Sequence, residues 1–212
     1  MHAFIATVPF TIIEAINFVL SNEIKDADLY LVKVFENAEQ TGKRIEKTKI
    51  FRNVYILEDV DLKNGTITVK GRKVINLLKD KKYKFCYYNN SGWLINSIFY
   101  TGFIKGNRDV KNIFLEHGYY SYVTDYADKP WYMRLIINMV GLKCMDGSMI
   151  DTLYMYEPEL ICTRYDGKIK KMKKLDKKNT QLVSALNDIF NYNVENNQYA
   201  DKKIIIMEQG PM

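Results

Sequence analysis

The sequence predicts an α/β fold with a Rossmann-like, mostly parallel sheet flanked by helices. Short apolar runs of strand length alternate with longer segments of helical periodicity along the chain. The run over residues 113–115 is continuously apolar, as expected when both faces of a parallel strand are covered, and it ends abruptly at Glu116. A chain of 212 residues, 47% of them hydrophobic, is long enough to bury a substantial core.

The chain opens as a strand, a tight turn and a helix. Residues 2–8 are mostly apolar, and Pro9 suits the first turn of a helix in which Ile12, Ile16 and Val19 recur at helical spacing. This is the first half of a βαβ unit. Further strands are predicted over residues 27–35, 54–57, 83–88, 112–116 and 151–156. Further helices are predicted over residues 93–100, over 129–140 behind Pro130, and from near Asn179 to 192.

Three other segments allow alternatives. Residues 37–52 are a polar, charged helix or a loop, and residues 61–69 form either a hairpin turned by Asn64-Gly65 or the turn before a helix over 71–81. Residues 201–212 resemble the first strand of a second α/β domain, although they could also complete the first sheet. We predict one Rossmann-like domain over residues 1–200 and the start of a second over 201–212.

The net charge of +6 is moderate, and much of it comes from a basic run that begins at Lys168 and ends at Lys178. Such a run is commonly a solvated loop or helix face, but it could contact anionic lipid head groups or an anionic glycan. No zinc-finger, helix-turn-helix or RNA-binding motif accompanies it, so we expect no nucleic-acid partner.

Cysteine usage and the N-terminal residues indicate a reducing compartment. Cys86, Cys144 and Cys162 are odd in number and lack CxxC spacing, and their apolar or aromatic neighbours predict buried, reduced thiols. The first 20 residues lack a basic region and a small-residue cleavage site, and polar residues interrupt their apolar run. We therefore expect no signal peptide, no membrane span and a cytoplasmic location.

The candidate chemistry lies where the run over residues 113–115 ends. The sequence contains no GxGxxG, GxxxxGK[ST], HExxH or GxSxG motif, and with two histidines a metal site is not expected. What remains is Glu116 beside His117, followed by Gly118 and surrounded by tyrosines that suit sugar rings. Either Glu116 or His117 could act as a general base. Alternatively, Glu116 caps a following helix and His117 is an ordinary loop residue.

Other polar residues follow neighbouring predicted strands. Because ligands of open α/β sheets bind at the carboxyl ends of the strands, these residues are candidates for lining the same cleft. They are Thr7, Pro9, Asn89, Asn90 and Ser91. A Ser-His-Asp triad drawn from Ser121, His117 and Asp125 is not favoured, because all three come from one short segment without a nucleophile elbow.

Three short motifs carry a family resemblance. ATVPF at residues 6–10, LEHGYYSY at 115–122 and LYMYEPEL at 153–160, together with the closing run over 204–211, resemble bacterial sialyltransferases of glycosyltransferase family 52. That family includes lipooligosaccharide and capsule sialyltransferases. The resemblance implies a GT-B architecture of two Rossmann-like domains, of which this chain is the N-terminal, acceptor-binding one.

The resemblance also implies roles for the residues of the second motif. The family's acid-acid-glycine motif, which supplies the general base, falls on Glu116, His117 and Gly118. Tyr119, Tyr120 and Ser121 then belong to the acceptor site. The second acidic position is a histidine here, which leaves Glu116 or His117 as the base, or an altered activity.

The implied reaction is inverting transfer of sialic acid from CMP-sialic acid to a cell-surface glycan by direct displacement, without a metal or another cofactor. The acceptor is expected to be lipid-linked and presented at the inner face of the cell membrane, and a homodimer is compatible with this. The family's donor-binding His-Pro motif does not occur in the sequence. The chain by itself is therefore expected to be inactive. The rival interpretation is a non-catalytic α/β domain that binds a glycan or a protein through its tyrosine-rich loop.

Overall fold

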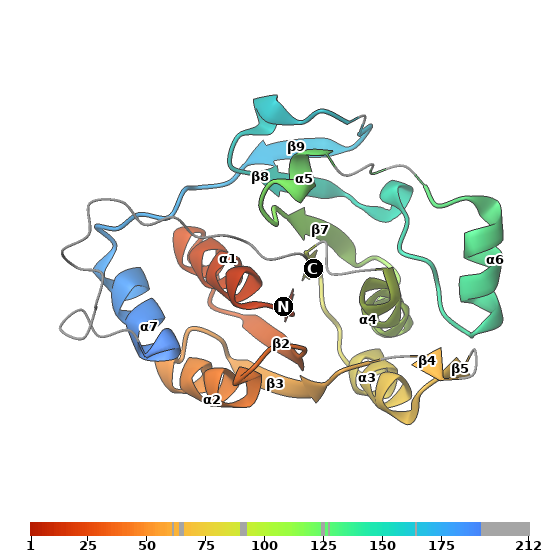
Figure 1. Ribbon diagram of the computed structural model, residues 1–212, viewed down its shortest axis with the longest axis horizontal. Coiled ribbons are helices and arrows are strands. Elements are labelled where there is room, and N and C mark those ends of the chain that lie inside the picture. Colours follow the sequence, from red (N-terminus) through yellow and green to blue (C-terminus); the bar gives the residue numbers. More distant parts are fainter. Residues whose placement is uncertain are drawn as a thin grey trace.

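The computed structural model describes residues 1–60, 62–63, 66–89, 93–123, 126, 128–163 and 165–191. Seven strands form one sheet in the order β3-β2-β1-β6-β7-β8-β9, and every neighbouring pair runs parallel (Figure 1). The strands are β1 (His2–Ala6), β2 (Ala27–Lys33), β3 (Asn53–Glu58), β6 (Phe85–Tyr88), β7 (Lys111–Leu115), β8 (Thr152–Met155) and β9 (Lys168–Lys171). The predicted Rossmann-like α/β fold is confirmed.

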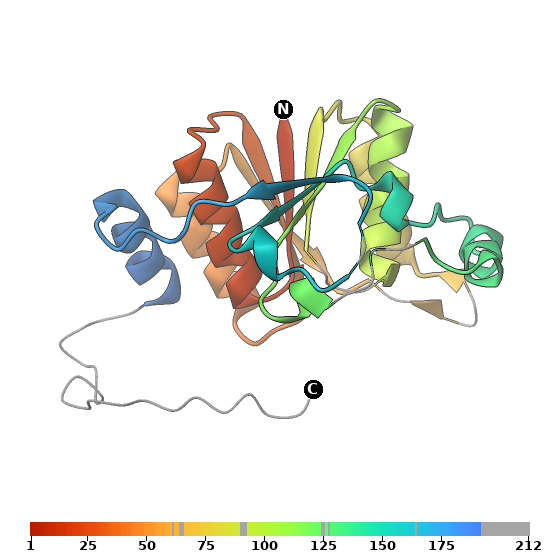
Figure 2. The same cartoon turned by 90° about the horizontal axis from the view of Figure 1, so that it is seen from above.

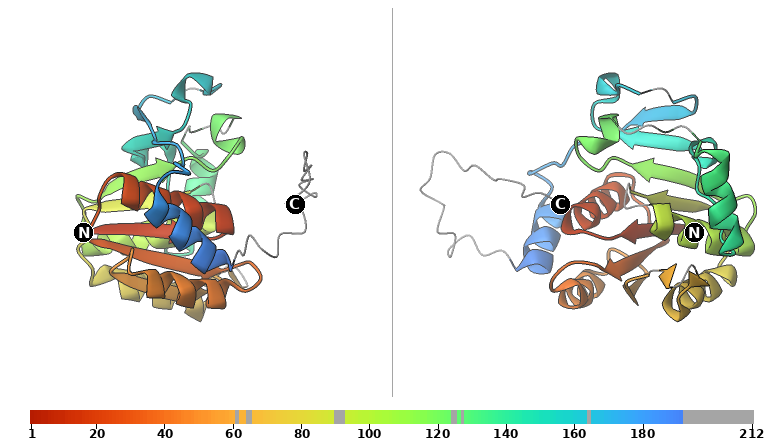
Figure 3. Two further views of the ribbon diagram at one scale, coloured as in Figure 1. Left: turned by 90° about the vertical axis from the view of Figure 1, so that its left-hand side faces the viewer. Right: turned by 45° about the vertical axis from the view of Figure 1, so that its right-hand side comes forward.

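Helices cover both faces of the sheet (Figure 2). One face carries α1 (Pro9–Ser21), α2 (Ala38–Thr48) and α7 (Thr180–Phe190), which lie side by side in the left panel of Figure 3. The other face carries α3 (Val69–Lys79) and α4 (Trp93–Gly106). The short helix α5 (Tyr120–Val123) follows β7, and α6 (Trp131–Met139) lies outside α4.

Alternating side chains of the strands build two cores. In β1, Phe4 and Ala6 point towards α1 and α2, whereas Ala3 and Ile5 point towards α3 and α4. Both sets are almost fully buried. Burial on both faces explains why the strand has no polar side of its own, as the sequence predicted for a parallel sheet.

The segment with two alternative predictions contains both structures. Strands β4 (Leu62–Lys63) and β5 (Thr66–Ile67) pair antiparallel, and α3 begins directly afterwards. The Thr68 side chain accepts a hydrogen bond from the backbone N–H of Gly71 and so caps the helix. The predicted turn residues Asn64 and Gly65 lie outside the described residues.

The basic run is not simply a loop or a helix face, because its first part is strand β9. This strand pairs with β8 at the edge of the sheet, and Ile169 packs against the core while Lys168, Lys170 and Lys171 are exposed. Lysines suit an edge strand because their charge opposes pairing with another chain. Helix α7 follows as predicted, with the Asn179 side chain accepting from the Leu182 N–H at 3.0 Å. The predicted domain boundary at 200/201 lies outside the described residues.

The prediction of buried thiols is correct for two cysteines and wrong for the third. Cys86 lies within β6 and Cys144 lies on the segment that runs along α4, and both are buried. Cys162 is exposed, because it follows the surface 3₁₀ turn η2 (Pro158–Leu160) instead of lying in a strand or helix. Among the described residues, no helix has the length and apolar character needed to cross a membrane.

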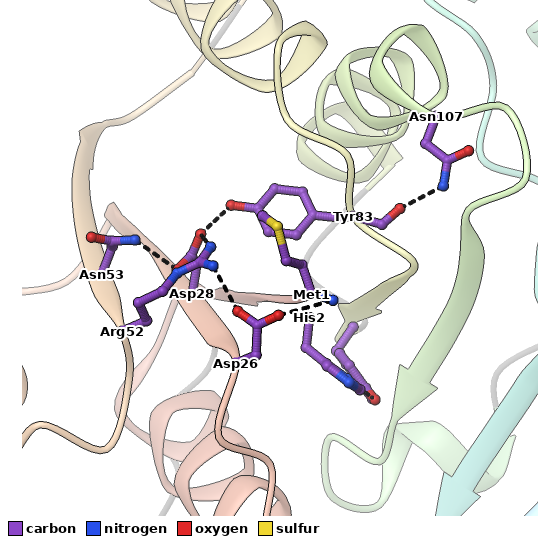
Figure 4. A network of polar contacts seen from close by, with 9 residues as sticks. Met1, His2, Asp26, Asp28, Arg52, Asn53, Tyr83 and Asn107 are labelled. Atoms are coloured by element: carbon purple, nitrogen blue, oxygen red, sulfur yellow. Dashed lines mark hydrogen bonds and ion pairs between the residues drawn. The ribbon is translucent and has the colours of Figure 1, made fainter.

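A buried carboxylate joins three segments at the amino edge of the sheet (Figure 4). Asp28 of β2 is fully buried and accepts two hydrogen bonds from the Arg52 guanidinium, at 2.9 and 2.7 Å. The Tyr83 hydroxyl and the Asn53 amide also donate to it, at 2.5 and 2.9 Å. Burial alone raises the pKa of the Asp28 carboxyl, but the hydrogen bonds outweigh this effect and leave that pKa below its usual value. β2, β3 and the segment before β6 are thereby held in register.

Replacing Arg52 with alanine leaves the buried Asp28 charge without its main partner. We expect the free energy of unfolding at pH 7 to fall by roughly 2–3 kcal/mol. This is at or below the lower limit of about 3–5 kcal/mol for a broken buried pair, because Arg52 is itself partly exposed. Urea denaturation measures this change. Because the folded pKa of Asp28 is depressed, the pair's contribution is present above pH ~4 and is lost as the pH falls through the folded value.

Lys43→Ala is the matched control. Lys43 forms an exposed pair with Glu39 at 2.9 Å on α2, and its removal should change the free energy of unfolding by less than ~0.5 kcal/mol. Equal effects of the two substitutions would contradict the structural role assigned to the Asp28 cluster.

Candidate functional site at the carboxyl edge of the sheet

Three predicted site residues follow neighbouring strands at the point where the connections of the sheet change direction. Chain order reverses between β1 and β6, and β7 lies on the far side of β6. The carboxyl ends of these three strands lead to Thr7, Asn89 and Glu116, all of which are buried. Such a switch point is the usual ligand site of an open α/β sheet. Asn90 and Ser91, which were predicted to line the same cleft, lie outside the described residues.

The turn between β1 and α1 satisfies its own polar groups. Pro9 is the first residue of α1, as predicted, and has no N–H to donate. The N–H groups of Thr7 and Val8 donate to the Thr11 hydroxyl oxygen, at 2.9 and 3.2 Å. That hydroxyl in turn donates to the Val8 carbonyl at 2.8 Å. This turn therefore has fewer N–H donors to offer a phosphate than a glycine-rich dinucleotide loop does.

Glu116 is held in place by two segments. Its Oε2 atom accepts a hydrogen bond from the Tyr122 hydroxyl at 2.5 Å and another from the Tyr156 N–H at 2.7 Å. The Tyr122 hydroxyl also accepts from the Glu157 N–H at 3.2 Å. The carboxylate thus joins α5 to the residues that follow β8, and its bonds go to these partners instead of to the first amides of a following helix.

His117 is half-buried and carries one unsatisfied polar atom. Its Nδ1 is shielded from solvent and has no hydrogen-bond partner among the described residues. The ring centroid lies 5.7 Å from that of Phe10, which places the imidazole beside the β1–α1 turn. Desolvation lowers the pKa of His117, so the ring is neutral at pH 7. A neutral imidazole has one nitrogen that can accept a proton.

The residues after His117 shape the edge of the site. Gly118 has φ +66°, a conformation that favours glycine, and it turns the chain into α5. Tyr119 is 74% exposed. Tyr120 begins α5, and its side chain lies outside the described part of the structure. Ser121 is buried, and its Oγ accepts the His117 N–H at 2.5 Å, which makes it a support of the turn.

Sequence reasoning missed a second carboxylate in the same network. Glu14 of α1 is fully buried, and the Tyr156 hydroxyl donates to both of its oxygens at 2.8 Å. Burial raises the pKa of Glu14 to about 7; the hydrogen bond from Tyr156 opposes this rise, and the charge of Glu116 adds to it. Asn17, one turn later on α1, donates to the Tyr156 hydroxyl at 3.4 Å.

A signal for these residues was present in the sequence. Glu14 and Asn17 are three positions apart within an otherwise apolar helix, so they share the face that packs on the sheet. Buried polar residues need partners, and this pair pointed to a polar site beneath α1. The partner Tyr156 could not be identified from the sequence, because it lies 142 residues from Glu14.

Two open recesses lie elsewhere on the surface. One of about 460 Å³ lies between the end of β2 and the start of α2 and is lined by Lys33, Phe35 and Lys43. Another of about 670 Å³ lies near the amino ends of β1 and β6 and includes His2 and Phe85. Neither includes Glu116 or His117. Within the described ranges, no three His, Cys, Asp or Glu side chains are arranged to hold a metal ion.

The raised pKa of Glu14 predicts how the free energy of unfolding depends on pH. Because its folded value is about 7 and its usual value 4.5, the folded protein keeps a proton that the unfolded chain releases between these values. The free energy of unfolding should therefore fall as pH rises from about 4.5 to 7. We expect Glu14→Gln to remove roughly 2–4 kcal/mol of this fall, measured by urea denaturation at a series of pH values.

Glu46→Gln, an exposed position on α2, serves as the control and should leave the pH dependence as it is in the wild-type chain. The assignment to Glu14 is wrong if Glu14→Gln and the wild type lose the same stability between pH 4.5 and 7.

Comparison with known proteins does not assign the chain to a family. No protein-family model matches the chain, and no curated protein matches it significantly. The resemblance of the three short motifs to the sialyltransferases therefore stays a prediction.

Proposed function

We propose that the chain is the acceptor-binding domain of a GT-B glycosyltransferase of the sialyltransferase type. In this proposal sialic acid passes from CMP-sialic acid to a cell-surface glycan such as lipooligosaccharide or capsule. The observation that carries it is His117, a half-buried, neutral imidazole at the carboxyl end of β7 beside the β1–α1 turn; because its Nδ1 is shielded from solvent, Nε2 is the nitrogen assigned to take the proton. A site that accepts a proton from a sugar hydroxyl needs such a group.

His117 is the better of the two candidate bases. An acceptor hydroxyl loses its proton as it attacks the donor sugar, so the base must have a lone pair to offer at neutral pH. The Oε2 atom of Glu116 already accepts hydrogen bonds from the Tyr122 hydroxyl and the Tyr156 N–H, so the protein itself occupies the positions from which an acceptor hydroxyl would approach that atom. We therefore assign proton transfer to His117 and the positioning of the α5 segment to Glu116.

The surroundings of His117 support a sugar as substrate. The Tyr119 ring next to it is exposed and offers a flat face of the kind that stacks on a pyranose. Gly118 makes the turn that brings this ring to the edge of the sheet. The same exposed ring supports the second candidate function, a non-catalytic domain that binds a glycan or a protein through this loop.

The remaining parts of the proposal concern the donor, the acceptor and the location. CMP-sialic acid is the donor substrate, no metal takes part, and the donor site is supplied outside the described residues. A lipid-linked acceptor at the cytoplasmic face of the membrane would meet the basic run. Within that run Lys171 and Lys174 pair with Glu157, whereas Lys168 and Lys178 are exposed and can face anionic head groups. A homodimer is part of the same proposal.

Replacing His117 with alanine tests the proposed base. With the full-length natural protein that contains this chain, we expect transfer from CMP-sialic acid to galactoside acceptors to lose ~10²-fold or more in kcat. Because desolvation lowers the pKa of His117, the acid limb of the kcat/KM profile should lie below pH 6.5 in the wild type. That limb should be absent from the residual activity of the variant.

His2→Ala is the matched control, because His2 is the chain's other histidine and lies at the opposite edge of the sheet, where its Nδ1 lies 2.9 Å from the Tyr87 hydroxyl. Its activity and pH profile should equal those of the wild type. Loss of the acid limb in Glu116→Gln but not in His117→Ala would transfer the role of base to Glu116. No transfer to any acceptor, combined with glycan binding that Tyr119→Ala abolishes, would support the non-catalytic function instead.

A further inference from the structure

Helix α6 exposes an apolar stripe that the proposed function does not use. Trp131 is 76% exposed and Met139 is 78% exposed, and Tyr132, Leu135 and Ile136 are each more than half exposed. Their positions follow the spacing i, i+1, i+4, i+5 and i+8, so all five lie on one face of the helix. A contiguous exposed apolar face of this kind marks an interaction surface.

The opposite face of α6 fixes the helix to the rest of the protein. Ile137 is buried and belongs to the same apolar core as the buried residues of α3 and α4. Arg134 makes ion pairs with Asp128 at 2.6 Å and with the buried Asp146 at 2.8 Å. The helix cannot roll to bury its apolar stripe without breaking these contacts. The stripe therefore stays exposed. The helix that carries it lies at the right-hand edge of the molecule in Figure 1.

The composition of the stripe suits a lipid surface. Two aromatic residues, Trp131 and Tyr132, lead the helix, and three flexible or branched aliphatic residues follow them. Trp and Tyr favour the boundary between head groups and acyl chains, and short amphipathic helices with such a face lie in that boundary. Because the apolar residues extend from the first to the last residue of α6, the helix can lie parallel to the membrane surface with all of them in the head-group boundary.

Charge around the stripe favours anionic lipids. Residues 129–143 contain no Asp or Glu, and the segment begins at Lys129 and ends at Lys143. Lys143 is exposed, and the neighbouring acid Asp128 is paired with Arg134. Lysines beside an inserted apolar face add electrostatic attraction to anionic head groups.

A second copy of the chain fits the stripe less well. A helix of nine residues is about 13.5 Å long. A standard protein–protein interface involves roughly 20–30 residues and 800 Å² on each side. Five exposed side chains on α6 fall well short of this, whereas a membrane imposes no minimum area because its binding energy accumulates with each inserted side chain.

We propose that the Trp131–Met139 face of α6 is a docking surface for membranes that contain anionic lipids. The apolar side chains enter the head-group boundary while Lys129 and Lys143 remain at the phosphate level. This surface is distinct from the basic run at residues 168–178, and the proposal does not depend on transferase activity.

Vesicle binding by the chain itself tests the proposal. The probe is phosphatidylcholine vesicles with 30% phosphatidylglycerol, compared with pure phosphatidylcholine, and binding is measured by co-sedimentation. Because the chain has two tryptophans, Trp93→Phe makes Trp131 the only one. We expect its emission to shift to the blue on the anionic vesicles and to be quenched by brominated acyl chains. An emission spectrum that vesicles leave unchanged would overturn the proposal.

The double variant Leu135→Gln/Ile136→Gln removes two inserted side chains at exposed positions that do not support the fold. We expect its partition coefficient to fall by about 10-fold or more, because the exposed halves of the two side chains together contribute the equivalent of roughly one to two decades when they are buried. Its thermal unfolding midpoint should match the wild type. Val34→Gln/Val183→Gln, at two exposed aliphatic positions outside α6 and outside the basic run, is the control and should bind like the wild type.

Three further results would overturn the proposal. Equal loss of binding in both double variants would mean that the attraction is not specific to α6. If the wild type is a dimer and Leu135→Gln/Ile136→Gln converts it to a monomer without changing vesicle binding, the stripe is a self-association surface. Charge reversal at Lys168 and Lys178 that abolishes binding while the α6 double variant binds normally would transfer the membrane contact to the basic run.

Discussion

The buried carboxylate of Asp28 is the interaction on which the arrangement of the sheet depends. It lies at the amino edge, where Arg52, Asn53 and Tyr83 converge on it from β3 and from the segment that leads into β6. In a parallel sheet the register set at one edge decides which residues meet at the other. The pairing that starts at this edge therefore delivers the ends of β1, β6 and β7 to one level, where the candidate site lies.

The candidate site contains buried polar residues on a helix, and hydrogen bonds from a distant segment offset the cost of burying them. Glu14 and Asn17 occupy the buried face of an apolar helix, and burial of unpaired polar groups is costly. Tyr156 resolves this conflict, because its hydroxyl bonds Glu14 while its N–H bonds Glu116. One residue thus links two carboxylates from α1 and β7. A buried acid with a raised pKa, linked through Tyr156 to the residue that precedes a histidine, is the kind of arrangement found at functional sites.

Most helices and strands could be predicted because the pattern of apolar residues within each segment is enough to indicate its secondary structure. The apolar runs of β1, β2 and β7 and the periodicity of α1 and α7 require no knowledge of the partners that cover them. Strand β9 escaped prediction because KIKK has too few apolar residues to resemble a buried strand. It exists because β8 offers a parallel edge and because one isoleucine packs inwards. Cys162 was misjudged for a related reason, since its neighbours are apolar but the chain there runs over the surface.

By itself, the sequence determined the fold class, the strand that ends at Glu116 and the position of His117, because apolar period and an abrupt polar end are local properties of the chain. The tertiary structure alone decided that Glu116 is held by Tyr122 and Tyr156 and that Glu14 is linked to Glu116 through Tyr156. It also decided that Nδ1 of His117 has no hydrogen-bond partner among the described residues. Likewise, the amphipathic pattern of α6 was visible in the sequence, yet only packing showed that Ile137 and Arg134 face the protein and that the larger apolar face does not. Burial and hydrogen bonding depend on which distant segments meet, and that is a property of the folded chain.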